Sequence, residues 1–188
     1  GPRPDIVVSG PNLGLNTGRS VLHSGTVGAA LAAQNFGMRG LAVSLAVSEE
    51  WHFDTACQYA IELLKALANG PERCALNLNV PALPYAQTKG LRWGGLAEFG
   101  SVRSQIVDQA EGQLFFDLVE TEYDPPADSD LGLVNAGFAA VTSLQCSAEV
   151  WSANLASNTD YQATSPMPAA SSGDVLKAAQ VFSPTTQN

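Results

Sequence analysis

Small hydroxyl and amide side chains are concentrated between residues 9 and 28, where they follow a short β-branched run. Ser24, Gly25 and Thr26 stand where the next apolar, helix-like run begins. Hydroxyl groups and the free backbone N–H groups of a helix N-terminus bind phosphate without any cationic side chain. Gly25 would also let the backbone approach the anion closely. This pattern predicts a phosphate site.

Two asparagines in the same stretch, Asn12 and Asn16, offer neutral oxygen ligands. Such oxygens suit a hard cation such as Mg²⁺, Mn²⁺ or Ca²⁺, whereas the amide N–H groups could instead donate to phosphate. Asn and Gly are equally typical of ordinary turns, so that alternative stays open. A Walker A loop is not favoured, because Leu13 and Arg19 stand where its first Gly and its Lys belong.

The elements that position this stretch predict an α/β fold. Residues 5–9 and 41–45 are strand-like, and the small apolar run 26–33 between them is helix-like. Strand, helix and strand in this order form a βαβ unit with a parallel sheet. The candidate site then lies at the carboxyl end of a strand, where ligands of open α/β sheets bind.

Later segments predict further elements of the α/β body and then hairpins that project from it. Apolar residues at helical spacing predict a helix over 53–67, and alternation predicts a strand over 76–80. Between 90 and 121, short alternating runs around glycines predict β-hairpins that project from the α/β body. A short helix over 128–135 and a strand over 138–144 follow. We expect one domain over residues 1–145 and a weakly ordered Ser/Thr/Ala-rich tail over 146–188.

Composition excludes several classes of protein. The 188 residues are 45% hydrophobic and 14% charged, which favours a packed core over disorder. The net charge of −9 argues against a protein that coats nucleic acid. No apolar run reaches the length of a membrane span. Cys57, Cys74 and Cys146 are scattered, which indicates free thiols and a cytoplasmic location.

The ordered motifs resemble the SurE-type survival proteins, which are metal-dependent 5′-nucleotidases, that is, nucleoside monophosphate phosphatases. The resemblance extends from residue 3 to about residue 145 in order and spacing. Its motifs are Pro4-Asp5-Ile6-Val7-Val8-Ser9-Gly10, Asn12-Leu13-Gly14-Leu15-Asn16, Ser24-Gly25-Thr26-Val27-Gly28-Ala29, Leu41-Ala42-Val43-Ser44-Leu45, Phe53-Asp54-Thr55-Ala56 and Leu76-Asn77-Leu78-Asn79-Val80-Pro81.

The resemblance implies a role for each matching residue. Asn12 matches a metal ligand, and Gly10 and Gly14 match glycines that shape the loop. The phosphate-binding group is matched by Asn16, Ser24, Gly25 and Thr26. The implied fold is a Rossmann-like three-layer sandwich with a β arm, here residues 90–124, exchanged within a homo-oligomer (dimer or tetramer). The implied activity is phosphoric monoester hydrolysis with a divalent metal.

One departure limits what the resemblance implies about activity. The family begins with a strand ending in Asp-Asp-Gly, whose aspartates bind the metal and supply the catalytic carboxylate. No Asp-Asp pair occurs in this sequence. We therefore expect that the N-terminal part of the fold is missing, that no catalytic residue is present and that this polypeptide alone is inactive. The alternatives are a non-catalytic phosphate- or nucleotide-binding pseudo-enzyme and an oligomerisation subunit.

Other chemically capable residues have simpler interpretations. Glu49, Glu50, His52 and Asp54 are more typical of a solvated loop and a helix start than of a metal cluster. Arg19 and His23 flank the candidate loop, where they could contact a substrate or lie on the surface. Asp128 and Asp130 are expected to cap a helix.

Overall fold

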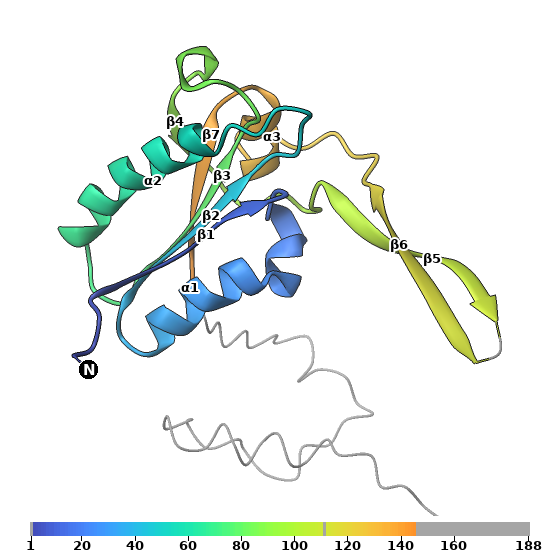
Figure 1. The fold of residues 1–188 in the computed structure, drawn as a ribbon, viewed down its shortest axis with the longest axis horizontal. Helices are drawn as coiled ribbons and strands as arrows, with labels where there is room; N and C mark the ends of the chain where they lie inside the picture. The colour runs from blue at the N-terminus through green and yellow to red at the C-terminus, as the bar shows by residue number, and fades with distance from the viewer. Residues whose placement is uncertain (1, 111, 146–188) are drawn as a thin grey trace, which may run out of the picture. The chain divides into compact units, whose positions relative to one another are not determined.

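The computed structural model describes residues 2–110 and 112–145, and its central feature is a five-stranded sheet in the order β1-β2-β3-β7-β4 (Figure 1). The strands of this sheet are β1 (Ile6–Leu13), β2 (Arg39–Leu45), β3 (Ala75–Val80), β4 (Leu91–Trp93) and β7 (Ala139–Leu144). The helices are α1 (Gly25–Asn35), α2 (Phe53–Ala68) and α3 (Asp130–Asn135), with 3-10 turns η1 (Gly18–His23) and η2 (Tyr85–Gln87).

The first three strands run parallel, as the βαβ pattern predicts. β7 lies antiparallel to β3, and β4 lies parallel to β7, so the whole sheet is mixed and mostly parallel. The reversal follows from the connection between β3 and β4, which contains only the short η2 and no helix long enough to cross the sheet. A parallel return needs a crossover of a dozen or more residues.

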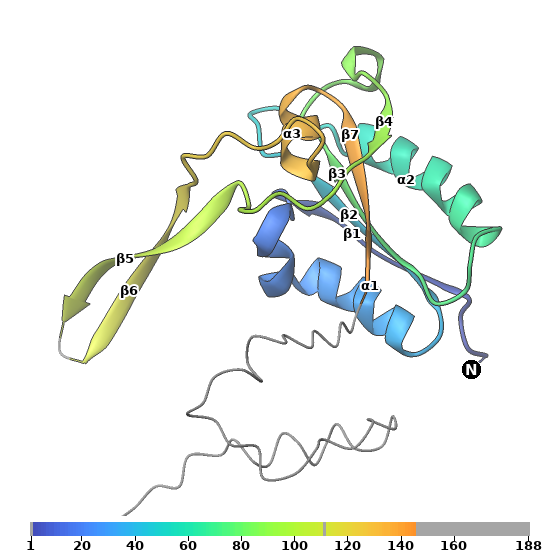
Figure 2. The same ribbon diagram turned by 180° about the vertical axis from the view of Figure 1, so that it is seen from behind.

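Helices α1 and α2 cover opposite faces of the sheet, which confirms the expected α/β sandwich (Figures 1 and 2). α2 buries one stripe, including Tyr59, Leu63 and Leu67, against Leu41 and Leu78 of the sheet. The helix ends at Ala68, just before the Gly-Pro pair that stops it. α1 is built of small residues and packs close to β2. A Cβ at Gly40 would lie 2.2 Å from the Ala30 carbonyl oxygen.

The other helix–sheet interface is small and lies beneath the candidate site. Val21, Val27, Ala30 and Ala42 form a buried apolar cluster between η1, α1 and β2. This cluster packs η1 and the first half of α1 against β2, and it therefore positions the residues around Ser24.

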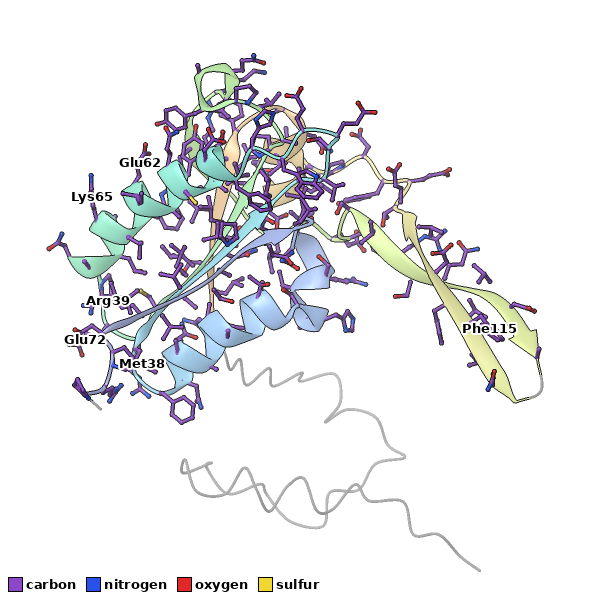
Figure 3. All side chains as sticks on the ribbon, viewed as in Figure 1. Met38, Arg39, Glu62, Lys65, Glu72 and Phe115 are labelled. Carbon is purple, nitrogen blue, oxygen red and sulfur yellow. The ribbon has the colours of Figure 1, made fainter. Side chains whose placement is uncertain are left out.

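The arm is a separate antiparallel hairpin made of β5 (Val102–Ala110) and β6 (Gln113–Glu120) (Figures 1 and 3). It occupies the central part of the range 90–124 expected to form the arm, whereas β4 within that range pairs with β7 in the main sheet. Several apolar arm side chains are exposed: Ile106, Val107, Leu114, Phe115 and Phe116.

Two expectations concern the remainder of the chain. The predicted tail over 146–188 lies outside the described residues. None of the helices in the described part of the chain is both long enough and apolar enough to cross a membrane.

Candidate functional site

The Asn16 loop, residues 14–17, leaves the end of β1 and is fixed to the sheet by hydrogen bonds. Asn16 N–H donates to Asn79 Oδ1 at 2.8 Å, and its carbonyl oxygen accepts from Asn77 Nδ2 at 2.8 Å and Asn79 Nδ2 at 3.0 Å. Its side-chain Nδ2 donates to Ser44 Oγ at 2.7 Å. Asn77 and Asn79 are fully buried on β3, so these residues form an asparagine clamp (Asn16, Ser44, Asn77 and Asn79).

The clamp places Asn16 at the site and uses one of the two N–H groups on its Nδ2 for the bond to Ser44. Asn16 thus holds the loop against β2 and β3, and its contact with phosphate stays a prediction. Sequence reasoning missed Asn77 and Asn79, although asparagine at alternate positions of a buried strand was a usable signal.

Asn12 and its flanking glycines shape the start of the loop. Asn12 Nδ2 donates to the Gly14 carbonyl oxygen at 2.8 Å, which leaves Oδ1 as the possible ligand atom. Gly10 and Gly14 have φ of 112° and 110°, a region that favours glycine. A Cβ at Gly10 would lie 2.3 Å from the Val43 carbonyl oxygen, so no larger residue fits there without movement.

The N-terminus of α1 presents donors in the arrangement expected from the sequence. Ser24 is the N-cap, and its Oγ accepts from Val27 N–H at 3.1 Å, so its own hydroxyl proton can still be donated. The first backbone bond of the helix runs from Gly28 N–H to the Ser24 carbonyl oxygen. Among the described residues, nothing accepts from the backbone N–H of Gly25 or Thr26. Gly25 is exposed, and a Cβ there would meet nothing within 4 Å.

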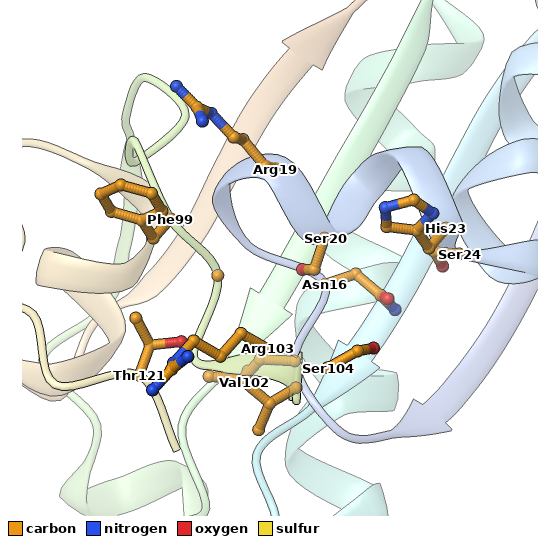
Figure 4. Close-up of a pocket in the computed structure, with 12 residues that line it drawn as sticks. Asn16, Arg19, Ser20, His23, Ser24, Phe99, Val102, Arg103, Ser104 and Thr121 are labelled. Atoms are coloured by element: carbon orange, nitrogen blue, oxygen red, sulfur yellow. The ribbon is translucent and has the colours of Figure 1, made fainter. Parts of the chain in front are cut away.

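A pocket of about 540 Å³ lies between this loop and the arm base, residues 97–104 and 120–123 (Figure 4). Asn16 and Ser24 line it, whereas Asn12, Gly25 and Thr26 are not among its lining residues. The structure also brings Arg19 and His23 to the pocket. The full lining is Leu15, Asn16, Arg19, Ser20, His23, Ser24, Phe99, Gly100, Val102, Arg103, Ser104 and Thr121.

The sequence did not predict that the arm base forms the wall of the pocket opposite the Asn16 loop. Phe99, Arg103 and Thr121 come from the arm base, far along the chain from the Asn16 loop. Arg19 is largely engaged elsewhere, since it pairs with Glu98 at 3.6 Å and its guanidinium lies 5.1 Å from the Phe99 ring centre. None of the described residues that line the pocket is acidic.

Asp130 joins the two walls of the pocket. Its carboxylate accepts from Gly18 N–H at 2.9 Å, Ala97 N–H at 2.8 Å and Leu131 N–H at 2.8 Å. The α3 cap that the sequence placed on Asp128 and Asp130 is instead made by Ser129, whose Oγ accepts from Gly132 N–H at 3.1 Å. Burial raises the pKa of Asp130, and the backbone hydrogen bonds from Ala97, Gly18 and Leu131 act in the opposite direction.

The described residues supply an incomplete donor set for a divalent cation. Asn12 Oδ1 is one neutral ligand, and a hard cation of this class takes about six oxygens, often including carboxylates. Within residues 2–110 and 112–145, no three His, Cys, Asp or Glu side chains are grouped as a metal site. That finding covers Glu49, Glu50, His52 and Asp54. Within this group, His52 Nε2 and Glu50 Oε2 lie 4.0 Å apart.

Comparison with known proteins places this geometry in a family. Residues 1–102 match the family model described as survival protein SurE. The chain is 40% identical over 149 residues to a 5′/3′-nucleotidase SurE of Yersinia pestis, a match that covers 77% of this chain and 58% of that protein. A 5′/3′-nucleotidase SurE of Yersinia pseudotuberculosis is 39% identical with the same coverage.

A solved structure agrees with the sequence matches. The crystal structure of SurE protein from Aquifex aeolicus superposes with a TM-score of 0.64 at 26% identity, covering 77% of this chain and 60% of that one. The chain thus spans 58% of the length of the curated Yersinia relatives. The match to the family model over residues 1–102, with these relatives and this solved structure, shows that the chain belongs to the SurE family.

Proposed function

We propose that this chain carries the phosphate-binding part of a nucleotidase site that takes nucleoside 5′-monophosphates. The observation that carries the proposal is the N-terminus of α1, where the N–H groups of Gly25 and Thr26 point out of the helix without an acceptor among the described residues. The Ser24 hydroxyl adds a third donor at the edge of the pocket. Three donors and the positive end of a helix dipole suit a phosphate dianion.

Each neighbouring residue has a distinct part in this proposal. The asparagine clamp keeps the Asn16 loop against the sheet, so the phosphate meets a surface that is already ordered. A lining without carboxylates avoids repulsion of the anion, which matters in a chain of net charge −9. The relatives are named 5′/3′-nucleotidases, which supports a phosphomonoester as the ligand.

We propose further that the 188-residue polypeptide does not hydrolyse this ligand by itself. In SurE-type enzymes a divalent metal (Mg²⁺, Mn²⁺ or Ca²⁺) would polarise the phosphate and activate a nucleophile. Asn12 is the one metal ligand that the sequence resemblance assigns here, and no three His, Cys, Asp or Glu side chains are grouped as a metal site among the described residues. Binding without turnover is the expected behaviour of this chain.

The phosphate site is tested by placing a charge in it. Gly25→Asp should lower the affinity for 5′-AMP and for inorganic phosphate at least tenfold, because a carboxylate would occupy the anion position. The fold should tolerate the change, since a Cβ at Gly25 meets nothing within 4 Å and an acid suits the first turn of a helix.

Ala32→Asp is the matched control for this titration. It adds the same charge at an exposed position of α1, about two turns further along the helix. Calorimetric titration should show AMP affinity within about twofold of wild type. Equal losses in both variants, or no AMP binding by the wild type, would refute the phosphate site.

A phosphatase assay tests the proposed lack of turnover. Purified 188-residue chain with 5′-AMP and Mn²⁺ should release no phosphate above the buffer rate. Turnover that disappears in Asn12→Ala would show that the chain is an active enzyme and would overturn this part of the proposal.

We also propose that the chain forms homo-oligomers, dimers or tetramers, through the arm. The exposed apolar side chains of β5 and β6 support this, because contiguous exposed apolar surface marks interaction sites. Phosphate binding and assembly are assigned to different residues. Measurements of phosphate affinity and of self-association would therefore identify a chain that has only one of the two properties.

A further inference from the structure

Ser24 of the proposed phosphate site lines one end of the pocket, and the opposite end has no assigned role. Figure 4 shows Ser24 and His23 at one side of the pocket and Arg103 and Thr121 at the other. Arg103 belongs to β5, and Thr121 follows β6 directly. Thr121 N–H donates to the Ser101 carbonyl oxygen at 3.0 Å, so Arg103 and Thr121 lie on adjacent chain segments near the base of the hairpin.

Arg103 forms no ion pair with any of the described residues. The ion pairs found in residues 2–110 and 112–145 are Arg19 with Glu98 and His52 with Glu50, and none involves Arg103. What distinguishes Arg103 is its place: it lines a pocket with no acidic residue in its described lining, although the chain has 18 acidic residues and only 9 Lys and Arg. Such a position attracts an anion from solution.

Thr121 supplies a second unsatisfied group at the same end. Its Oγ1 is buried and has no hydrogen-bond partner among the described residues. A buried hydroxyl without a partner is unfavourable by roughly 1–3 kcal/mol, and a ligand oxygen in the pocket would satisfy it. Together with Ser104, this end of the pocket offers hydroxyl and guanidinium donors.

The lining of this end favours an anion over a nucleobase. Phe99 is the aromatic side chain of the described lining, and its ring is already engaged. Arg19 lies over it at 5.1 Å, and Tyr123 packs edge-on with ring centres 5.2 Å apart. A base would have to displace one of these contacts to stack on the ring.

The distance between the two ends is fixed by the chain itself. Asp130 holds Gly18 and Ala97 on one carboxylate. Gly18 fits so tightly that a Cβ would lie 2.3 Å from the Phe99 carbonyl oxygen, and a Cβ at Gly100 would lie 2.8 Å from Ser20 Cβ. The arm base and the segment leading to Ser24 therefore form one rigid frame around the pocket.

From these observations we propose that the arm base is a second anion subsite, with Arg103 and Thr121 as its specificity-determining residues. The preferred ligand class would be nucleotides with a second phosphate, such as a nucleoside 3′,5′-bisphosphate. The first phosphate binds at Ser24, Gly25 and Thr26, so this inference rests on the proposed function. The second subsite would determine which nucleotides bind most tightly.

The test compares ligands that differ in the second phosphate. Calorimetric titration of the 188-residue chain with 5′-AMP, ADP and adenosine 3′,5′-bisphosphate should show at least one of the doubly phosphorylated ligands binding tenfold or more tighter than AMP. ADP and the bisphosphate distinguish a second phosphate on the 5′ chain from one at the 3′ position. The gap should shrink as salt is raised, because the added contact is ionic.

Two arginine variants separate the subsite from general charge effects. Arg103→Gln should remove the advantage of the second phosphate and leave AMP affinity within about twofold. Arg92→Gln should keep the advantage, because Arg92 lies 4.1 Å from the Phe138 ring centre and is not part of the pocket lining. Thr121→Val should reduce the advantage about threefold.

The outcomes distinguish this inference from the function on which it rests. AMP binding with no gain from a second phosphate overturns the subsite and leaves the phosphate site standing. A loss of AMP affinity in Arg103→Gln as large as the loss for the bisphosphate also overturns it. Failure of every ligand to bind the wild type overturns both proposals.

Discussion

Side chains of the central strands of the sheet are buried, whereas most side chains of the arm are exposed. All six residues of β3, and all but the first of β2, are buried between α1 and α2. Along β5 and β6, by contrast, nearly all the described residues are exposed, among them Phe115 at 46% and Phe116 at 61%. The two regions are joined through the arm base, which also forms one wall of the pocket.

This difference indicates which interactions stabilise each region. The sheet is stabilised within the chain, by apolar packing against α2 and by the asparagine clamp on the side of α1. An isolated two-stranded hairpin has little stability of its own in water. The arm therefore gains its stability from its fixed base and, in our proposal, from a second copy of the chain. Substitutions in the two regions should have separable effects.

The largest loss of stability is expected at the junction of the two regions. Asp130→Ala leaves the buried N–H groups of Gly18 and Ala97 without their acceptor. The free energy of unfolding in urea should fall by about 3 kcal/mol. Asp128→Ala, an exposed acid two residues earlier, should change it by less than about 0.5 kcal/mol. Equal effects of the two variants would mean that the Asp130 carboxylate does not join the segments.

A smaller loss is expected within the asparagine clamp. Asn79→Ala removes the acceptor of Asn16 N–H and one donor to the Asn16 carbonyl oxygen. Thermal or urea unfolding should show a loss of about 2 kcal/mol.

Thr142→Val is the matched control for the clamp. Thr142 lies opposite Asn77 on the neighbouring strand and is also buried, but its Oγ1 has no partner among the described residues. Replacing this hydroxyl with a methyl group should leave the stability unchanged or raise it slightly. If Thr142→Val destabilises the chain as much as Asn79→Ala does, burial alone and not the clamp explains the loss.

The smallest effect on folding is expected on the arm. Phe116→Ser should change the free energy of unfolding of the monomer by less than about 0.5 kcal/mol, because its side chain is 61% exposed. Sedimentation velocity over a range of concentrations should show weaker self-association.

An exposed aromatic of the sheet region serves as the control for Phe116. Trp51 is 63% exposed, and Trp51→Ser should leave self-association unchanged. A wild-type chain that stays monomeric at every concentration, or a Phe116→Ser variant that associates normally, would contradict assembly through the arm.

Local patterns in the sequence predicted the elements that local interactions determine. The helix expected over 53–67 is α2, because its apolar spacing produces the stripe that the sheet buries. The start of α1 follows from Ser24, whose side chain caps the helix. In both cases the decisive residues are close neighbours in the chain, and a pattern within one or two turns contains the information.

Long-range contacts explain what the sequence did not predict. Asp130 looked like a helix-capping residue, and its partners Gly18 and Ala97 lie 112 and 33 residues away in the chain. The direction of β7 relative to β3 depends on the short connection between β3 and β4 and on how the chain returns from the arm, which no pattern within a single element encodes. Arg103 resembles any other charge on an alternating strand until the fold places it at the pocket.

The hydrogen bonds of Asp130 have a consequence for how the arm can vary. The carboxylate grips the chain at Ala97, before the hairpin begins, and α3 resumes the body after it ends. Both attachment points therefore lie outside β5 and β6. The part of β5 beyond Ser104 lies outside the pocket lining, so the length and apolar surface of the outer hairpin can change while Val102, Arg103 and Ser104 keep the pocket wall in place.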